Sequence, residues 1–198
     1  RMSDLQRATR GYGLLEGFLV RKRCALAQNL LVRHKVDAIL DIGCGSFPLL
    51  LSRMSASKRT GLDRVPHANE IPGIDMVTQD IAASAQLPAP DASYDAVTML
   101  AVIEHIPEAV AIQLLSEVHR VLRPGGLVVI TTPASWTDGI LRFMARVRLV
   151  SPEEIDEHTA AYSPNLLRDR LIAAGFKKDN IEVGTFELGM NLWASGVR

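Results

Sequence analysis

The sequence predicts an α/β fold in which seven strands form a doubly wound, mostly parallel sheet. Three observations lead to this prediction. Short apolar segments alternate with helical segments, the order that builds parallel strands through right-handed crossovers. The first strand runs into a glycine turn, as is typical of open α/β sheets. The last stretch, 181–194, alternates around Gly189-Met190-Asn191, which predicts a hairpin that adds an antiparallel strand at one edge of the sheet.

The elements follow in order along the chain. Apolar residues at helical spacing predict a first helix over 14–34, ahead of the first strand. Strand patterns then recur at Val36–Ile42, Arg59–Asp63, Ile74–Thr78, Tyr94–Leu100 and Leu127–Thr132. Further helices are predicted at Pro48–Ser55, Glu108–Leu122 and Pro164–Ala174. The connection from Asp63 to Ile74 is too short for the usual crossover helix.

Turn and capping residues support these boundaries. Ser163 before Pro164 combines an N-cap with a proline at the first helical position, and Ser151-Pro152 repeats this pair. Gly175 stands where the helix after Ser163 should end. The run Arg123–Gly126 contains Pro-Gly-Gly, so it should stop the preceding helix.

Length and composition indicate one domain with a sizeable core. The chain has 198 residues, of which 47% are hydrophobic and 22% charged, as is ordinary for a globular protein. Within this domain, 1–35 is interpreted as an N-terminal helical cap. The segment 133–162 departs furthest from the strand–helix rhythm and is interpreted as a lid-like insertion. The formal net charge is zero, so no overall field attracts nucleic acid.

Cysteine usage and hydropathy bear on location. The chain has two cysteines, Cys24 and Cys44, which do not form a disulfide framework and so favour a reduced, cytoplasmic setting. No apolar run reaches transmembrane length and no signal-peptide layout is present, so integral membrane association is not expected. The sequence leaves the oligomeric state open.

The glycine turn is the most informative motif. Gly43 and Gly45 follow Asp41, which lies in an apolar strand, and Asp63 ends the next strand. A dinucleotide-binding turn needs glycine where Pro48 stands, and a carboxylate such as Asp41 repels a pyrophosphate. A nucleoside with a cationic group and no phosphate fits better, and S-adenosylmethionine is such a ligand. Asp63 can accept hydrogen bonds from both ribose hydroxyls.

Several segments stand in an order typical of one family: Ile39–Gly45, Gly61–Asp63, Gln79–Ile81, Tyr94–His105, Leu122–Gly126, Thr131–Pro133 and His158–Phe176. Through them the chain, from about Val36 onward, resembles the class I S-adenosylmethionine-dependent methyltransferases of the bacterial type 11 group, which have a Rossmann-like fold. One departure is Phe47, which replaces the family's third glycine. Because positive φ is costly for phenylalanine, the turn is expected to be arranged differently here.

The resemblance implies a cofactor site at the carboxyl ends of the strands. Its implied residues are Asp41, Gly43, Gly45, Asp63, Arg64, Asp80, Ile81, Met99, Leu100 and Ala101. Some of them have a structural alternative. Asp41 could cap the turn amides, Asp80 could be the N-cap of a helix over 81–85, and the 99–101 segment could be core.

Methyl transfer mainly requires alignment of donor and acceptor, but a hydroxyl acceptor also benefits from a general base. The candidates are His158 and His105, since a neutral imidazole can take a proton near pH 7. His158 could equally be a surface residue, and Glu104-His105 could instead order its loop. The acidic run before His158 lacks a convincing ligand set, so no metal is expected.

The predicted function is therefore that of a methyltransferase acting on a small molecule or saccharide, with oxygen the favoured acceptor atom. No Asn/Asp-Pro-Pro-Tyr motif follows the fourth strand, where Met99–Val102 stands instead, and this counts against amide or base-amine methylation. Two alternatives stay open. One is a nicotinamide-dependent oxidoreductase of Rossmann type, and the other a non-catalytic S-adenosylmethionine-binding partner protein.

The insertion also carries residues with two interpretations. Arg142, Arg146 and Arg148 are either a solvated face or the basic side of an amphipathic lid that binds an anionic substrate or a membrane surface. Trp136 follows Thr132-Pro133 closely and is a better candidate than Trp193 for a substrate-facing aromatic.

Overall fold

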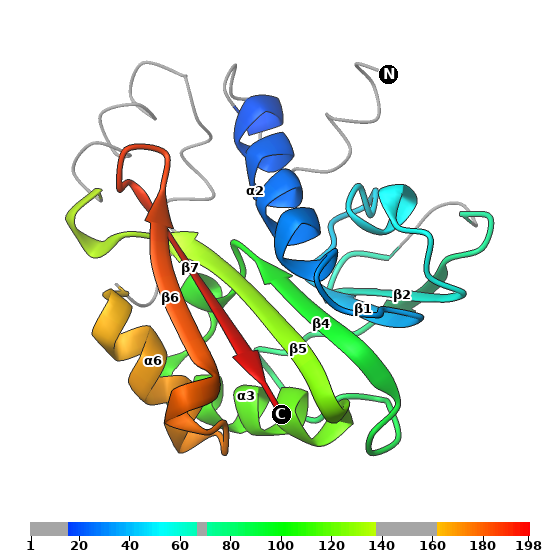
Figure 1. Ribbon diagram of the computed structural model, residues 1–198. Coiled ribbons are helices and arrows are strands. Elements are labelled where there is room, and N and C mark those ends of the chain that lie inside the picture. The colour runs from blue at the N-terminus through cyan, green and yellow to red at the C-terminus, as the bar shows by residue number, and fades with distance from the viewer. Residues whose placement is uncertain (1–15, 67–70, 138–161) are drawn as a thin grey trace.

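The computed structural model describes residues 16–66, 71–137 and 162–198, which form one seven-stranded sheet with helices on both faces (Figure 1). The strand order is β3-β2-β1-β4-β5-β7-β6. The strands are β1 Ala38–Ile42, β2 Lys58–Asp63, β3 Asp75–Thr78, β4 Tyr94–Leu100, β5 Leu122–Pro133, β6 Ile181–Phe186 and β7 Asn191–Val197. The predicted doubly wound, mostly parallel sheet is confirmed.

The C-terminal hairpin is also confirmed, but its predicted place at the edge is wrong for the antiparallel strand. β7 lies between β5 and β6 and is antiparallel to both, so β6 forms the edge. The reason is burial: β7 is mostly buried, whereas β6 carries exposed residues such as Glu182 and Thr185, which suit an edge. The turn spans 187–190, slightly earlier than predicted, and Asn191 already belongs to β7.

Three α-helices are described: α2 Glu16–Leu31, α3 Glu108–Val121 and α6 Pro164–Ala173. α6 begins as predicted, because the Ser163 hydroxyl accepts a hydrogen bond from the Leu166 amide and Pro164 is at the first helical position. It ends before Gly175, whose φ is +104°. The Ser151-Pro152 cap lies outside the described residues.

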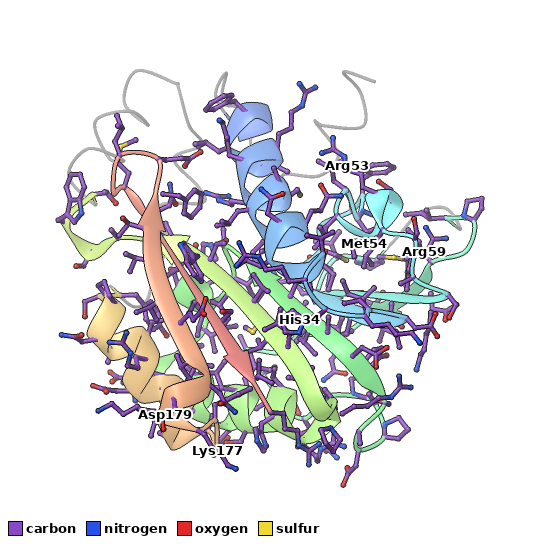
Figure 2. The ribbon with its side chains drawn as sticks, in the orientation of Figure 1. His34, Arg53, Met54, Arg59, Lys177 and Asp179 are labelled. Carbon is purple, nitrogen blue, oxygen red and sulfur yellow. The ribbon has the colours of Figure 1, made fainter. Side chains whose placement is uncertain are left out.

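The helix predicted at Pro48–Ser55 is wrong, since the structure has only the 3₁₀ turn η1, Leu51–Arg53. Leu49, Leu50 and Leu51 are all buried, and three adjacent buried side chains do not fit one face of an α-helix. The Arg59 side chain from β2 donates to the carbonyl oxygens of Leu51 and Met54 at 3.3 and 3.5 Å, which holds the turn against the sheet (Figure 2). The other 3₁₀ turns are η2 Ile103–His105, η3 Ser135–Thr137 and η4 Lys178–Asn180.

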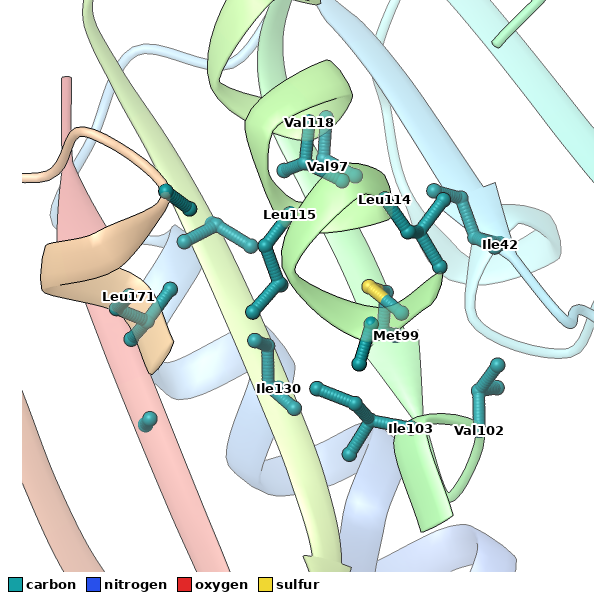
Figure 3. Close-up of a cluster of buried hydrophobic side chains, with 14 of the residues drawn as sticks. Ile42, Val97, Met99, Val102, Ile103, Leu114, Leu115, Val118, Ile130 and Leu171 are labelled. Atoms are coloured by element: carbon teal, nitrogen blue, oxygen red, sulfur yellow. The ribbon is translucent and has the colours of Figure 1, made fainter. Parts of the chain in front are cut away.

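The two faces of the sheet have separate cores. On one face, α3 and α6 cover side chains from β1, β4 and β5, including Ile42, Met99 and Ile130 (Figure 3). On the other face, α2 packs on β4 and β5 through Cys24, Ala27 and Leu31. Because side chains alternate along a strand, Asp41 lies on the α2 face together with Ile39.

No helix within the described ranges combines the length and the apolarity that a bilayer span requires.

Candidate functional site

The glycine turn joins the carboxyl end of β1 to η1 and is fixed against β2. Gly43 and Gly45 have φ values of +71° and +70°, a region that glycine enters without the penalty of a Cβ. The Gly43 amide donates to the Leu62 carbonyl at 2.7 Å. A Cβ on Gly43 would lie 2.3 Å from Cγ2 of Val102, so the turn also needs glycine for space. Phe47 is not among the described residues with positive φ, which agrees with the different arrangement expected there.

Asp41 is buried on the α2 face, and its carboxyl pairs with a residue that the sequence did not single out. The Thr98 hydroxyl, on the neighbouring strand β4, donates to Asp41 Oδ1 at 2.5 Å. Burial raises the pKa of the Asp41 carboxyl to about 7, the charge of Asp63 acts in the same direction, and the Thr98 hydrogen bond opposes both. Near neutral pH this carboxyl can therefore gain or lose a proton.

Asp63 ends β2 and accepts hydrogen bonds from two backbone amides. The Gly45 amide donates to Oδ2 and the Val65 amide to Oδ1, each at 2.9 Å. The carboxylate thus orients the glycine turn and the start of the next connection. A carboxylate has about four lone-pair positions, so it can accept more than two hydrogen bonds. Arg64, the next residue in the chain, is exposed.

Asp80 and Ile81 follow the carboxyl end of β3. The Ala82 amide donates to Asp80 Oδ1 at 2.9 Å, so the side chain caps the turn at 81–83, in line with the capping interpretation. Asp80 is exposed, whereas Ile81 is buried in the α3-side core. The implied contact with adenine stays a prediction.

Met99, Leu100 and Ala101 end β4, and the structure separates their roles. The Met99 side chain is fully buried beside Leu114 and Ile130 (Figure 3), so only its backbone can face a ligand. Leu100 is half-buried in the α2-side core. Ala101 has a φ of +57°, and its amide donates to the Thr131 carbonyl and hydroxyl. A left-handed alanine stores strain, which is often found at functional sites.

Of the two candidate bases, His105 is among the described residues. His105 closes η2 directly after β4 and is partly exposed, while Glu104 beside it is buried. His158 lies outside the described residues, as do Arg142, Arg146 and Arg148. Of the other described histidines, His34 follows α2 ahead of β1 (Figure 2), and His119 packs edge-on against Phe176. His105 is therefore the described histidine that lies at the carboxyl ends of the strands, the same edge of the sheet as the acids.

The two ends of the insertion meet at the sheet. Ala134 and Tyr162 form a parallel bridge, and the Ser135 amide donates to the Tyr162 carbonyl at 2.9 Å. Tyr162 is buried, and burial raises its pKa to about 12. Trp136, next to this bridge, is 60% exposed, whereas Trp193 is half-buried on β7. Residues 138–161 lie outside the description, so the lid-like role of 133–162 stays a prediction, as does the cap role of 1–35.

Neither cysteine is suited to covalent chemistry. Both thiols are buried and unbridged, and burial raises the pKa of each well above its ordinary value. Within the described part of the chain, no three His, Cys, Asp or Glu side chains lie together in a group that could hold a metal ion.

The sequence did not reveal the hydrogen bond from Thr98 to Asp41, or the left-handed backbone of Ala101 with its bond to the Thr131 hydroxyl. Both depend on pairing between β1, β4 and β5. The only sequence signal was the presence of Thr98 in β4 and Thr131 in β5, and a buried strand also tolerates threonine for packing.

Comparisons with known proteins agree with this geometry. A family model described as "Methyltransferase domain" matches residues 18–181. A Mycolicibacterium smegmatis protein, named as a probable S-adenosylmethionine-dependent methyltransferase, is 35% identical over 124 residues, or 60% of this chain and 46% of that protein. Trans-aconitate 2-methyltransferase of Azoarcus sp. is 29% identical over 134 residues, or 62% of this chain and 51% of that protein. Ubiquinone biosynthesis O-methyltransferase of Sodalis glossinidius is 26% identical over 171 residues, or 69% and 68%.

Among solved structures, an S-adenosylmethionine-dependent methyltransferase from Archaeoglobus fulgidus superposes with a TM-score of 0.64 over 91% of this chain and 94% of that one. At 16% identity, this likeness supports the fold alone. The chain spans about half the length of the first two curated relatives that it matches.

Proposed function

The chain belongs to the methyltransferase-domain family of S-adenosylmethionine-dependent proteins, and on that premise we propose that it transfers a methyl group to a hydroxyl of a small molecule or saccharide. The observation that carries the proposal is the gathering of Asp41, Asp63 and Asp80 at the carboxyl ends of β1, β2 and β3, around a glycine turn. Ligands of open α/β sheets bind at these ends. The family match favours this reading over a nicotinamide-dependent oxidoreductase.

The residues present fit S-adenosylmethionine as the methyl donor. Asp63 is oriented by two backbone amides at the carboxyl end of β2, and a carboxylate there can accept hydrogen bonds from ribose hydroxyls. Asp41, buried on the α2 face, is available as a counter-charge for the ammonium group, directly or through water. Asp80 and the backbone at Ile81 are assigned to the adenine.

The chemistry divides simply between donor and protein. When bound, S-adenosylmethionine supplies a methyl group that is electrophilic because it is attached to a sulfonium. The protein's part is to orient the acceptor and exclude water, and this positioning can lower the activation barrier substantially. His105 is our candidate to hold the acceptor's hydroxyl proton, with His158 as the alternative.

Oxygen as the acceptor atom is supported by two independent points. The strand end at 99–102 lacks the Asn/Asp-Pro-Pro-Tyr motif of amide and base-amine methylation. The names of the relatives from Azoarcus sp. and Sodalis glossinidius describe methylation of a small molecule and at oxygen, respectively.

The proposal is tested first by calorimetric titration with S-adenosylhomocysteine and with NAD. We expect binding of the first and none of the second. Transfer from methyl-labelled donor to a panel of hydroxyl, amine and carbon acceptors then follows, with the methylated position read by NMR. Products methylated only at nitrogen or carbon would reject oxygen as the acceptor atom. Tight S-adenosylhomocysteine binding with no transfer to any acceptor would favour a non-catalytic partner protein.

The general base has its own test. His105→Gln should lower kcat about 100-fold and remove the acid limb of the pH profile, with S-adenosylhomocysteine affinity kept. His119→Gln is the matched control, because His119 packs on Phe176 at the end of α3. An unchanged kcat in the first variant would transfer the role to another group.

A further inference from the structure

We propose that Glu117 and Arg120, on α3, are positioning residues for the adenine end of the cofactor and set the preference of the protein for adenine over hypoxanthine. They act through the β3–β4 connection, residues 79–93, which consists of turns and irregular backbone and carries Asp80 and Ile81. The inference rests on the proposed function, which assigns Asp80 and the backbone at Ile81 to the adenine.

Glu117 and Arg120 lie one turn apart on α3 and form a two-point ion pair. Arg120 Nε donates to Glu117 Oε1 and Arg120 Nη2 donates to Glu117 Oε2, each at 2.7 Å. Both side chains are mostly buried, with 29% of Arg120 and 22% of Glu117 exposed. A guanidinium is planar and rigid, so two parallel bonds fix its orientation as well as its position. The remaining donors and acceptors of the pair therefore point in fixed directions.

The ion pair holds the second half of the β3–β4 connection at Leu87. The Leu87 amide donates to Glu117 Oε2 at 2.9 Å, and the Leu87 carbonyl accepts from Arg120 Nη2 at 3.2 Å. Arg120 Nη1 also donates to the Ala89 carbonyl at 2.9 Å and to Asp91 Oδ1 at 2.6 Å. Because the Leu87 side chain is buried in the α3-side core, its amide, carbonyl and side chain are all fixed on α3.

A further hydrogen bond links this fixed point to Asp80. The Gln79 side-chain amide donates to the carbonyl of Gln86, the residue before Leu87, at 2.6 Å. The backbone amide of Gln79 donates to the Asp63 carbonyl at 2.9 Å. Residues 79 and 86 thus close a loop that contains Asp80, and the loop is tied to α3 on one side and to the end of β2 on the other.

Asp80 depends on this loop because its own supports are local. The side chain is exposed, and its bond from the Ala82 amide lies within the turn at 81–83. Ile81, the next residue, is buried in the α3-side core. The place of the Asp80 carboxylate relative to the sheet is therefore set by how the connection sits on α3. Binding groups need such support, since small displacements weaken recognition.

The chemistry of the base turns this support into selectivity. Adenine carries an amino group at its sixth position, which can donate to a carboxylate. Hypoxanthine carries a carbonyl oxygen there, which a carboxylate repels. Asp80 held in one place discriminates between the two bases. If Asp80 were free to move, it could avoid the repulsion and would lose part of the bond to adenine.

The test uses the full chain and two ligands, S-adenosylhomocysteine and S-inosylhomocysteine, whose base is hypoxanthine. The preference is the ratio of their Kd values, measured by calorimetry. We expect wild type to prefer S-adenosylhomocysteine. Glu117→Ala and Arg120→Ala should each lower this preference about 10-fold, mainly through weaker binding of S-adenosylhomocysteine. A merely structural role would weaken both ligands equally, and that result would overturn the proposal.

Two further variants serve as controls. Glu117→Gln keeps a side-chain oxygen that can accept from the Leu87 amide, so it should retain most of the preference. Arg123→Ala removes a different ion pair, in which Arg123 Nη1 donates to Asp95 Oδ1 at 2.6 Å beside the start of β1. Its preference should equal that of wild type. An equal loss of preference in Arg123→Ala would indicate general destabilisation and would overturn the proposal.

Gln79→Ala tests the same path without a change in α3, so it decides the question even if the α3 variants fold poorly. It removes the bond to Gln86 and should also lower the preference. An unchanged preference in Gln79→Ala would refute the proposal. A wild type that binds both ligands equally would reject the assignment of adenine to Asp80, and this inference with it. A wild type that binds neither ligand would reject the proposed function itself.

Discussion

The edge of the sheet at which β1, β2 and β4 end has two halves that are held in different ways. On the β1–β2 side, each acid has an internal partner: Thr98 for Asp41, and the amides of Gly45 and Val65 for Asp63. On the β6–β7 side, a carboxylate oxygen of Glu187 is buried without a partner among the described residues, and so is Nε of Arg23 on α2. The acids of the first half are held by hydrogen bonds within the protein. The second half keeps buried polar atoms that make no hydrogen bond within the described residues.

The half with internal partners is the half that is proposed to bind the donor. A donor shared by a whole family can be bound by a turn whose geometry is fixed by backbone contacts. Variants that change one half of the edge and leave the other intact test this difference.

The largest effect on ligand binding is expected from Asp63→Asn. The amide would place an NH₂ group against one of the two backbone amides and remove the charge from both bonds. S-adenosylhomocysteine affinity should fall about 100-fold, as measured by calorimetry. Asp179→Asn, exposed in η4 (Figure 2), is the control and should bind normally. A Kd for Asp63→Asn within threefold of wild type would show that the first half does not depend on this acid.

Gly43→Ala tests the space around the glycine turn. The added Cβ meets Val102 Cγ2 at 2.3 Å, and the φ of +71° strains any other residue. Together these should lower the free energy of unfolding by about 3 kcal/mol, measured by chemical denaturation. Adding Val102→Ala removes the clash but not the backbone strain, so it should restore only part of the loss. Full stability in the single variant would mean that the turn adapts more freely than its contacts suggest.

Asp41 predicts a pH dependence of stability with a defined sign. Its pKa rises from 3.8 in the unfolded chain to about 7 on folding, so the folded state binds more protons between these values. The contribution of Asp41 to stability therefore falls as pH rises from about 4 to about 7. Asp41→Asn lacks this loss, and it should gain about 4 kcal/mol relative to wild type between pH 4 and pH 8.

Denaturation curves of both proteins across that range measure the difference. A gap that stays constant with pH would show that Asp41 does not titrate on folding. A linked result is expected with ligand: a cation placed beside Asp41 favours its charged form, so S-adenosylhomocysteine should bind more tightly as pH rises through 7.

The smallest effect is expected at Ala101, where the two halves of the edge meet. Ala101→Gly relieves the left-handed strain at φ +57° but adds freedom to the unfolded chain, so stability should rise by less than about 1 kcal/mol. Thermal unfolding measures this change, and Ala92→Gly is the control, since Ala92 is also left-handed but is exposed, whereas Ala101 is half-buried. If catalysis uses the strain, Ala101→Gly should lower kcat while Ala92→Gly does not.

The sequence singled out cofactor candidates in one half of the edge and none in the other. Glycines and acids at fixed spacing after apolar strands are local patterns, so Asp41, Gly43 and Asp63 could be named as candidates from the chain alone. Glu187 and Arg23 lie on a turn and a helix far apart in sequence, and the burial of their polar atoms depends on the fold. Glutamate and arginine are usually found at the surface, so no local signal marked these two positions.

The errors have the same origin. The helix predicted at Pro48–Ser55 does not form because Leu49, Leu50 and Leu51 are all buried. Their burial depends on packing against distant parts of the chain, which the local sequence does not show. The inner position of β7 depends on a competition between two strands for the same neighbour, β5. Periodicity identifies a segment as a strand but does not say which of the two strands pairs with β5.

The bridge between Ala134 and Tyr162 has a consequence for how this domain can change over evolutionary time. The chain leaves the sheet and returns to it at the same point. The sheet therefore fixes where the two ends of the intervening segment meet but not how long that segment is. For a flexible loop in general, doubling the length costs only about 0.6 kcal/mol in closure entropy. Insertions or deletions after Thr137 are therefore expected to leave the pairing of the seven strands unchanged.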